Sequence, residues 1–161
     1  MTSRDLDLLD AIQMAKEIEL KAAALYADAS QKTFNPLGRG LFEQLAKFER
    51  HHYDKLVELE KSLRGEGAFA GYEGRELAMD VPGEVGSIKE VERMSAMAII
   101  TMSRDIEREA EKRYIALAEQ STDPTVASMF KQLAEEEHSH YRILSDAYWS
   151  LSNHGVWVWK G

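Results

Sequence analysis

The sequence contains an internal repeat: a shift of 88 residues, the distance from Glu19 to Glu107, aligns one part of the chain with another. Without a gap, this offset superposes residues 14–53 on residues 102–141, and both apolar and polar residues recur. A repeat of this length predicts two similar structural halves. The identical pairs include Met14 and Met102, Glu19 and Glu107, Ala22 and Ala110, Tyr26 and Tyr114, Pro36 and Pro124, Phe42 and Phe130, Gln44 and Gln132, Leu45 and Leu133, Ala46 and Ala134, Glu49 and Glu137, His52 and His140, and Tyr53 and Tyr141.

Each half of the repeat has the periodicity of two helices. Apolar residues recur at intervals of three and four over four long segments, and very little of the sequence alternates as a strand would. We therefore expect an all-α protein. The predicted segments are residues 5–30, residues 36–63, a third segment that begins at Ser87, and a fourth that runs from Pro124 to about residue 153.

Helix-start signals support three of these boundaries. Asn35 and Asp123 each precede a proline, which pairs an N-cap side chain with a proline in the first helical turn. Ser87 and Glu90 have the spacing of a capping box at the start of the third helix.

The connections between the predicted helices are unequal. Short joins produce antiparallel hairpins, here residues 5–63 and 87–153. Residues 64–86 form a long link that can span ~70 Å, well beyond the ~38 Å of a 25-residue helix. We therefore predict one domain, residues 1–161, folded as a ferritin-like four-helix bundle with one long crossover between the second and third helices. The alternative is a disordered linker between two independent hairpins.

Six ionisable residues interrupt the apolar stripes of these helices. On the fourth helix, Glu137 and His140 continue the spacing of Phe130, Leu133 and Leu144, so they occupy interior positions. The other three helices carry equivalent residues in the same manner. The full set is Glu19, Glu49, His52, Glu107, Glu137 and His140.

This residue set predicts two metal ions at the centre of the bundle. An unpaired carboxylate in an apolar interior is costly or becomes protonated. Two divalent cations would balance four carboxylates, and each would gain a histidine nitrogen. A glutamate three residues before a histidine lies on the same helix face, because the rotation between them is ~300°. The alternative is a buried polar network without metal. Tyr26 and Tyr114 either hydrogen-bond to ligand carboxylates or fill core space.

A second Glu-x-x-His pair, Glu135 and His138, lies on a different helix face. Two residues correspond to ~200° of rotation, so this pair and the pair Glu137 and His140 cannot both face inward. The stripe and the repeat favour the latter, and His51 and His138 are expected in solvent. His154 is expected near the end of the last helix and not at the metal.

Composition restricts the chemistry further. The chain has no cysteine, which excludes disulfides, a thiol nucleophile and an iron–sulfur cluster held by this chain. Any redox metal must therefore use oxygen and nitrogen ligands. A net charge of -8 argues against nucleic acid or an anionic membrane as a partner. No apolar run has the length of a signal peptide or a membrane span, so a cytoplasmic protein is expected.

The arrangement of the six residues resembles the rubrerythrin-like branch of the ferritin-like superfamily, over the chain up to about residue 153. The resemblance implies that Glu49 and Glu137 bridge two iron ions and that Glu19 and Glu107 each bind one of them. It also implies that His52 and His140 complete one ion apiece. Manganese would accept the same ligands.

Two features depart from the family pattern. Position 110 is alanine, where rubrerythrins usually carry a further glutamate. Rubrerythrins also commonly carry a rubredoxin-like iron domain, which a chain without cysteine lacks, so electrons must come from an external donor. Residues 155–161 contain Trp157 and Trp159 and replace the short fifth helix of ferritins. These tryptophans are expected to cover a bundle end or a second subunit.

The resemblance implies an oxidoreductase whose di-iron centre reduces hydrogen peroxide or dioxygen. Two alternatives are a ferroxidase that stores iron in a bacterioferritin-type cage, and a non-catalytic interaction module stabilised by metal. A homodimer is the expected assembly.

Overall fold

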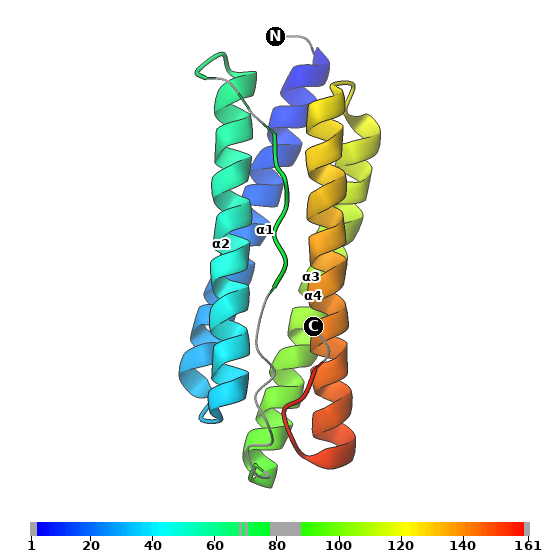
Figure 1. Ribbon diagram of the computed structural model, residues 1–161. Coiled ribbons are helices and arrows are strands. Elements are labelled where there is room, and N and C mark those ends of the chain that lie inside the picture. Colours follow the sequence, from blue (N-terminus) through cyan, green and yellow to red (C-terminus); the bar gives the residue numbers. More distant parts are fainter. Residues whose placement is uncertain (1–2, 68, 70, 78–87, 160–161) are drawn as a thin grey trace.

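The computed structural model describes residues 3–67, 69, 71–77 and 88–159, and within these ranges it contains helices and no strand. This confirms the prediction of an all-α protein (Figure 1). The helices are α1 (Ser3–Lys32), α2 (Pro36–Leu63), α3 (Glu90–Gln120) and α4 (Pro124–His154). None of the described helices combines the length and the apolar character needed to cross a membrane.

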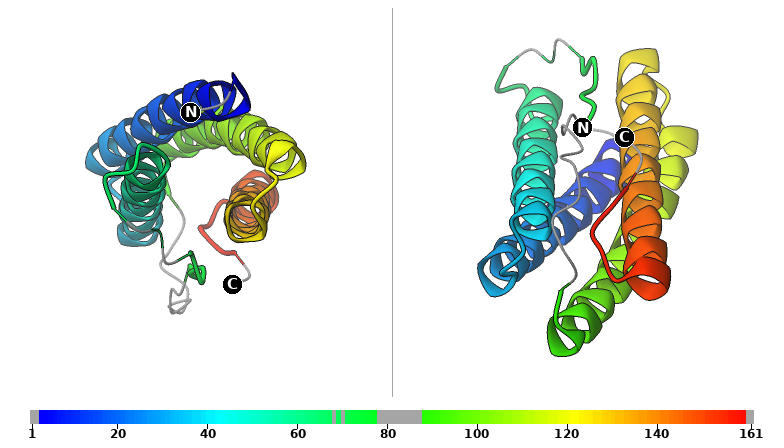
Figure 2. Two further views of the ribbon diagram at one scale, coloured as in Figure 1. Left: turned by 90° about the horizontal axis from the view of Figure 1, so that it is seen from above. Right: turned by 60° about the horizontal axis from the view of Figure 1, so that its bottom comes forward.

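The four helices pack as two antiparallel hairpins joined by a crossover. α1 packs along α2, α3 packs along α4, and α1 of the first hairpin packs against α3 of the second. α2 and α3 run in the same direction, and residues 71–77 of the chain between them run back along the bundle (Figure 1). Residues 71–77 of this crossover lie between α2 and α4, which Figure 2 shows from the end of the bundle. The packing of α1 on α3 rules out two independent hairpins and confirms the ferritin-like topology.

The helix-start predictions are confirmed at α2 and α4. Asn35 Oδ1 accepts hydrogen bonds from the backbone N–H groups of Leu37 and Gly38, at 2.9 and 3.4 Å. Asp123 Oδ1 accepts one from the N–H of Thr125 at 2.8 Å. Each cap satisfies helical N–H groups that have no partner within the helix.

The predicted start of α3 is wrong by about two residues. The helix begins at Glu90, and the N-cap residue is Lys89, whose side chain makes no capping hydrogen bond to a described residue. Ser87 lies outside the described residues. Glu90 instead forms an ion pair with Arg93 on the surface of the first turn of α3.

The core consists of two apolar clusters with a polar layer between them. One cluster surrounds Tyr26, Phe42 and Ile100, and it includes the C-terminal tail. The other surrounds Ile12, Tyr114 and Phe130. The inward-facing glutamates and histidines lie between these clusters along every helix, so the apolar ends of the bundle hold the polar middle in place.

The tail covers one end of its own bundle. Trp157 and Trp159 are 2% and 3% exposed, and the Trp157 ring meets the ring of Phe42 edge-on with centroids 5.8 Å apart. Gly38 makes room for this indole, because a Cβ atom there would lie 2.5 Å from Trp157 Cε2. The described part of the tail, residues 156–159, is not helical. Of the two predicted roles for the tryptophans, covering the bundle end is therefore confirmed.

Candidate metal centre

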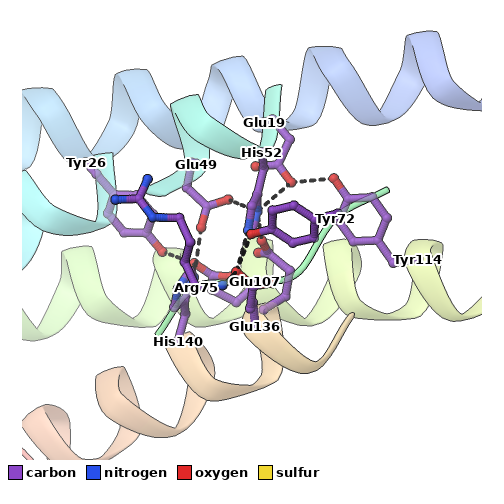
Figure 3. A network of polar contacts seen from close by, with 11 residues as sticks. Glu19, Tyr26, Glu49, His52, Tyr72, Arg75, Glu107, Tyr114, Glu136 and His140 are labelled. Atoms are coloured by element: carbon purple, nitrogen blue, oxygen red, sulfur yellow. Dashed lines mark hydrogen bonds and ion pairs between the residues drawn. The ribbon is translucent and has the colours of Figure 1, made fainter. Parts of the chain in front are cut away.

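The six residues expected at the metal centre all lie in the polar middle layer, one or two from each helix. Every one of them is at most 1% exposed. α1 contributes Glu19 and α3 contributes Glu107, while α2 and α4 each contribute a Glu-x-x-His pair. Figure 3 shows five of these side chains converging from all four helices, namely Glu19, Glu49, His52, Glu107 and His140. Burial is therefore as the periodicity predicted, and the repeat places equivalent residues on opposite sides of the centre.

The carboxylate and imidazole atoms form two overlapping groups, each with the spacing of a metal site. In each group one ligand atom per residue lies within 4.8 Å of all the others. Glu49 and Glu137 belong to both groups. The first group is completed by Glu19 and His52, and the second by Glu107 and His140. This sharing is what two adjacent ions with bridging carboxylates require.

Both histidines direct the same ring nitrogen toward the carboxylates. His52 Nδ1 lies 2.6 Å from Glu137 Oε1 and 3.4 Å from Glu19 Oε1. His140 Nδ1 lies 2.9 Å from Glu49 Oε1 and 3.6 Å from Glu107 Oε1. Nδ1 is therefore the candidate ligand atom in each half, and Nε2 points away from the centre.

Several of these buried atoms have no well-directed partner. Glu19 Oε2, Glu107 Oε2, Glu137 Oε1 and His52 Nδ1 form no hydrogen bond with any other described residue. Glu137 Oε1 and His52 Nδ1 are close enough for an ion pair but lack the alignment of a hydrogen bond. An unsatisfied buried polar atom costs about 1–3 kcal/mol. Oxygen and nitrogen donors that face a common space are suited to divalent iron or manganese, so the residues present fit two such ions.

The pKa values of the carboxyl groups show the cost of this cluster without cations. Burial, together with the neighbouring Glu49, raises the pKa of Glu19 well above its usual range. Burial and the neighbouring Glu107 raise the pKa of Glu137 in the same way. Burial would also raise the pKa of Glu49, but hydrogen bonds from Glu19 and His140 outweigh it and hold this pKa well below the usual value. Without cations, two of the four carboxyl groups thus tend to hold protons.

The pKa values of the two histidines are raised, which is opposite to the effect of burial alone. Burial lowers the pKa of His52, but the carboxylates of Glu19 and Glu137 outweigh it and raise that pKa well above its usual value. For His140, Glu107 and Glu49 outweigh burial and raise the pKa to about 9. A field this negative attracts protons when no other cation is present, and a bound metal ion would replace them.

Two tyrosines tie the hairpins together at the centre. The Tyr26 hydroxyl on α1 donates a hydrogen bond of 2.6 Å to Glu107 Oε1 on α3. Reciprocally, the Tyr114 hydroxyl on α3 donates to Glu19 Oε1 on α1. Figure 3 shows the two tyrosines on opposite sides of the cluster. Of the two predicted roles, hydrogen bonding to carboxylates of the candidate site is the one that the structure supports, and both rings are also part of the apolar clusters.

A fifth buried carboxyl group, Glu136, was not predicted from the sequence. Its side chain is 5% exposed, and its Oε1 accepts hydrogen bonds from the Tyr72 hydroxyl at 2.6 Å and from the backbone N–H of Arg75 at 3.2 Å. Burial raises its pKa, but hydrogen bonds from His52 and Tyr72 outweigh this and keep it below the usual value. The repeat contained a signal, since its offset places Glu136 on Phe48, a residue type that is expected inside.

The other histidines and Ala110, which the sequence also singles out, belong to neither group of candidate ligands among the described residues. His138 is exposed and pairs with Glu111 at 3.0 Å, as expected for a solvent-facing residue. His51 was expected in solvent but is only half-exposed, because Tyr72 of the crossover lies beside it with ring centroids 5.9 Å apart. His154 is exposed in the last turn of α4. Ala110 is buried in the apolar cluster that contains Ile12.

Comparison with known proteins agrees with this architecture. Residues 98–155, which include Glu107, Glu137 and His140, match the family model described as Rubrerythrin. A solved structure titled "Hypothetical Protein Pfu-1136390-001 From Pyrococcus furiosus" superposes with a TM-score of 0.72 at 22% identity, over 94% of each chain. At this identity the likeness establishes the fold alone. No curated protein sequence matches the chain.

The fold and the buried cluster together define a ferritin-like bundle with a candidate di-metal centre. The family match confirms the rubrerythrin-like resemblance over residues 98–155, which hold the second copy of the repeated ligand set.

Proposed function

We propose that this protein binds two iron ions in the buried cluster and reduces hydrogen peroxide or dioxygen there. One observation carries the proposal: two groups of four donor atoms share Glu49 and Glu137, and several of those buried atoms lack any other partner among the described residues. Manganese would suit the same donors. The rubrerythrin match over α3 and α4 favours redox chemistry over a purely structural metal.

The residue roles follow from their membership of the two groups. Glu49 and Glu137 would contact both ions, because each belongs to both groups. His52 and Glu19 would complete one position, and His140 and Glu107 the other. Tyr114 and Tyr26 hold one oxygen of Glu19 and of Glu107 by hydrogen bonds, which orients those carboxylates within the centre.

Reduction of hydrogen peroxide consumes two electrons and two protons and yields two water molecules. When bound, two ferrous ions would supply one electron each and a Lewis-acidic position for the oxidant. The protein side chains contribute the ligand set, its orientation, and burial that keeps bulk water away from the reaction. An external donor must restore the two electrons, because the chain has no cysteine with which to hold an iron centre of the rubredoxin type.

The first test is metal content. Purified protein loaded anaerobically with ferrous iron should retain about two ions per chain, and Glu49→Ala and Glu137→Ala should each lose most of this metal because both residues belong to both groups. Glu135→Ala is the matched control, since Glu135 is an exposed glutamate on the same helix as Glu137. Wild-type protein that retains neither iron nor manganese would contradict the proposal.

The second test is reactivity. Iron-loaded, reduced protein is mixed with hydrogen peroxide or with dioxygen in stopped flow, and oxidation should be faster than that of the same concentration of free ferrous iron. If the protein-bound iron were oxidised no faster than free ferrous iron by either oxidant, the oxidoreductase would be ruled out and a structural metal favoured. Size-exclusion mass distinguishes the storage alternative, because a large shell would support iron storage and the expected homodimer would oppose it.

A further inference from the structure

The surroundings of the two histidines break the symmetry of the repeat. The 88-residue offset that relates His52 to His140 places Phe48 on Glu136. The Phe48 ring meets both imidazoles edge-on, with centroid distances of 5.3 Å to His52 and 4.6 Å to His140. Glu136 instead presents a carboxylate to His52. One of two otherwise equivalent positions thus carries an additional charged neighbour.

The contact reaches the outer nitrogen of His52. Glu136 Oε1 lies 3.4 Å from His52 Nε2, at the long end of the range for hydrogen bonds. A metal ion on Nδ1 would leave the single ring proton on Nε2, where it faces this carboxylate. The corresponding Nε2 of His140 is buried and has no hydrogen-bond partner among the described residues. Among the described residues, His52 thus has a carboxylate at its outer ring nitrogen and His140 does not.

The crossover holds Glu136 in this position. Its Oε1 accepts from the Tyr72 hydroxyl and from the backbone N–H of Arg75, so residues on both sides of Gly74 converge on the same oxygen. Figure 3 shows Tyr72 and Arg75 placed over the cluster from the crossover. Gly74 has φ +92°, and a Cβ atom there would lie 2.3 Å from Gln132 Nε2 on α4. This close approach gives the crossover a defined position on α4, one helical turn before Glu136.

We propose that Glu136, held by Tyr72 and the Arg75 backbone, is a positioning residue for His52 and makes the metal position at His52 the tighter-binding of the two. The inference rests on the proposed two-metal centre. A carboxylate behind a ligating imidazole fixes the ring orientation and tautomer and increases the basicity of the ligand nitrogen. The crossover is then part of the metal centre as well as a connection.

Titration of metal-free, full-length protein with Co²⁺ tests this directly. Wild-type protein should bind two ions in two resolvable steps. Glu136→Gln preserves the side-chain shape and removes the charge, so the tighter step should weaken by about 10–100-fold while the weaker step stays unchanged. Tyr72→Phe should weaken the same step by a smaller factor. Glu135→Gln, a change of the exposed neighbour, should leave both steps as they are, and thermal unfolding verifies that every variant is folded.

A spectroscopic measurement separates positioning from a general structural effect. In the Co²⁺-loaded protein each ligating imidazole has one ring N–H, which gives a paramagnetically shifted NMR signal that disappears on exchange with solvent. The His52 signal should exchange slowly in wild-type protein and faster in Glu136→Gln, whereas the His140 signal should be unaffected.

The possible outcomes are distinguishable. If Glu136→Gln binds both ions with wild-type affinity, or weakens both steps equally, Glu136 does not position His52 selectively and the inference is wrong while the two-metal centre stands. If wild-type protein binds no Co²⁺, iron or manganese, the proposed function fails and the inference fails with it. The wild-type titration decides this before any variant is compared.

Discussion

At the scale of single residues, the centre is made of side chains that an apolar core would normally exclude. Glu19, Glu49, Glu107 and Glu137 stand at positions where the same helix faces elsewhere carry Leu, Ile and Ala. In the absence of cations the pKa values of Glu19 and Glu137 are raised, so these two groups tend to hold protons, which reduces the repulsion between the carboxylates. Hydrogen bonds from the tyrosine hydroxyls reduce it further. Such a cluster is expensive without a function, because removing a carboxylate from water is costly unless it is paired.

The tyrosine hydroxyls are expected to contribute measurably to this compensation. Tyr114→Phe should lower the free energy of unfolding of the metal-free protein by about 1–3 kcal/mol, because Glu19 loses a buried donor. Tyr26→Phe should have a similar effect through Glu107. Chemical denaturation followed by circular dichroism measures both values.

Tyr53 is the matched control for these variants. It is half-buried on α2, and its hydroxyl makes no hydrogen bond to another described residue. Tyr53→Phe should therefore change the free energy of unfolding by less than about 0.5 kcal/mol, as is usual for surface substitutions. If Tyr53→Phe and Tyr114→Phe lost equal stability, the hydroxyl bonds to the carboxylates would not be the cause.

At the scale of elements, close approaches decide how the tail and α2 fit together. Trp157 sits directly on Gly38, in the first turns of α2, and shares a cluster with Phe42 and Leu41. Nothing in the sequence around Gly38 or Trp157 indicates that these two residues meet. The tail was therefore predictable as apolar, while its attachment point was not.

Gly38→Ala should displace the tail. The added methyl would lie 2.5 Å from the Trp157 ring, and overpacking of this kind costs about 1–3 kcal/mol. We expect a lower melting temperature and a shift of tryptophan fluorescence toward longer wavelength as the indole becomes solvated.

Gly40→Ala provides the comparison for this substitution. Gly40 lies ~200° around α2 from Gly38, away from Trp157, and alanine is the better helix former. This variant should leave the tryptophan fluorescence as in wild type, because its added methyl does not face Trp157. Unchanged fluorescence in Gly38→Ala would show that the contact does not hold the tail.

At the scale of the whole molecule, metal binding should couple to global stability. The candidate ligands come from all four helices, so two bound ions would link both hairpins. At metal concentrations of about 100 times Kd, two sites would add about 5 kcal/mol, which corresponds to roughly 10–20 °C in Tm for a chain of this size. Differential scanning calorimetry with and without chelator measures this difference.

Glu137→Gln should separate the metal effect from folding itself. The substitution removes a buried carboxyl whose pKa is raised in the metal-free protein, so the metal-free variant should unfold within a few degrees of wild type. The increase in Tm on adding metal should be largely lost, because Glu137 belongs to both groups. An equal metal-induced increase in the variant would contradict the assignment of Glu137 to the centre.

Much of the structure could be predicted from local sequence patterns. The helix starts at Asn35 and Asp123 follow from residues adjacent in the chain, and the three-and-four spacing determines which side chains face inward. The predicted start of α3 is wrong because Ser87 and Glu90 have the spacing of a capping box, and spacing alone does not show where the backbone becomes helical.

The sequence by itself determined the all-α class, the repeat of two hairpins and the six inward-facing candidate ligands. These depend on helical periodicity, which is a local property of the chain. Only the tertiary structure decided that Tyr72 and Arg75 bond to Glu136 and that Trp157 packs on Gly38. Those contacts join an irregular crossover and tail to distant helices, and segments without a repeating backbone geometry carry no periodic signal of what they will touch.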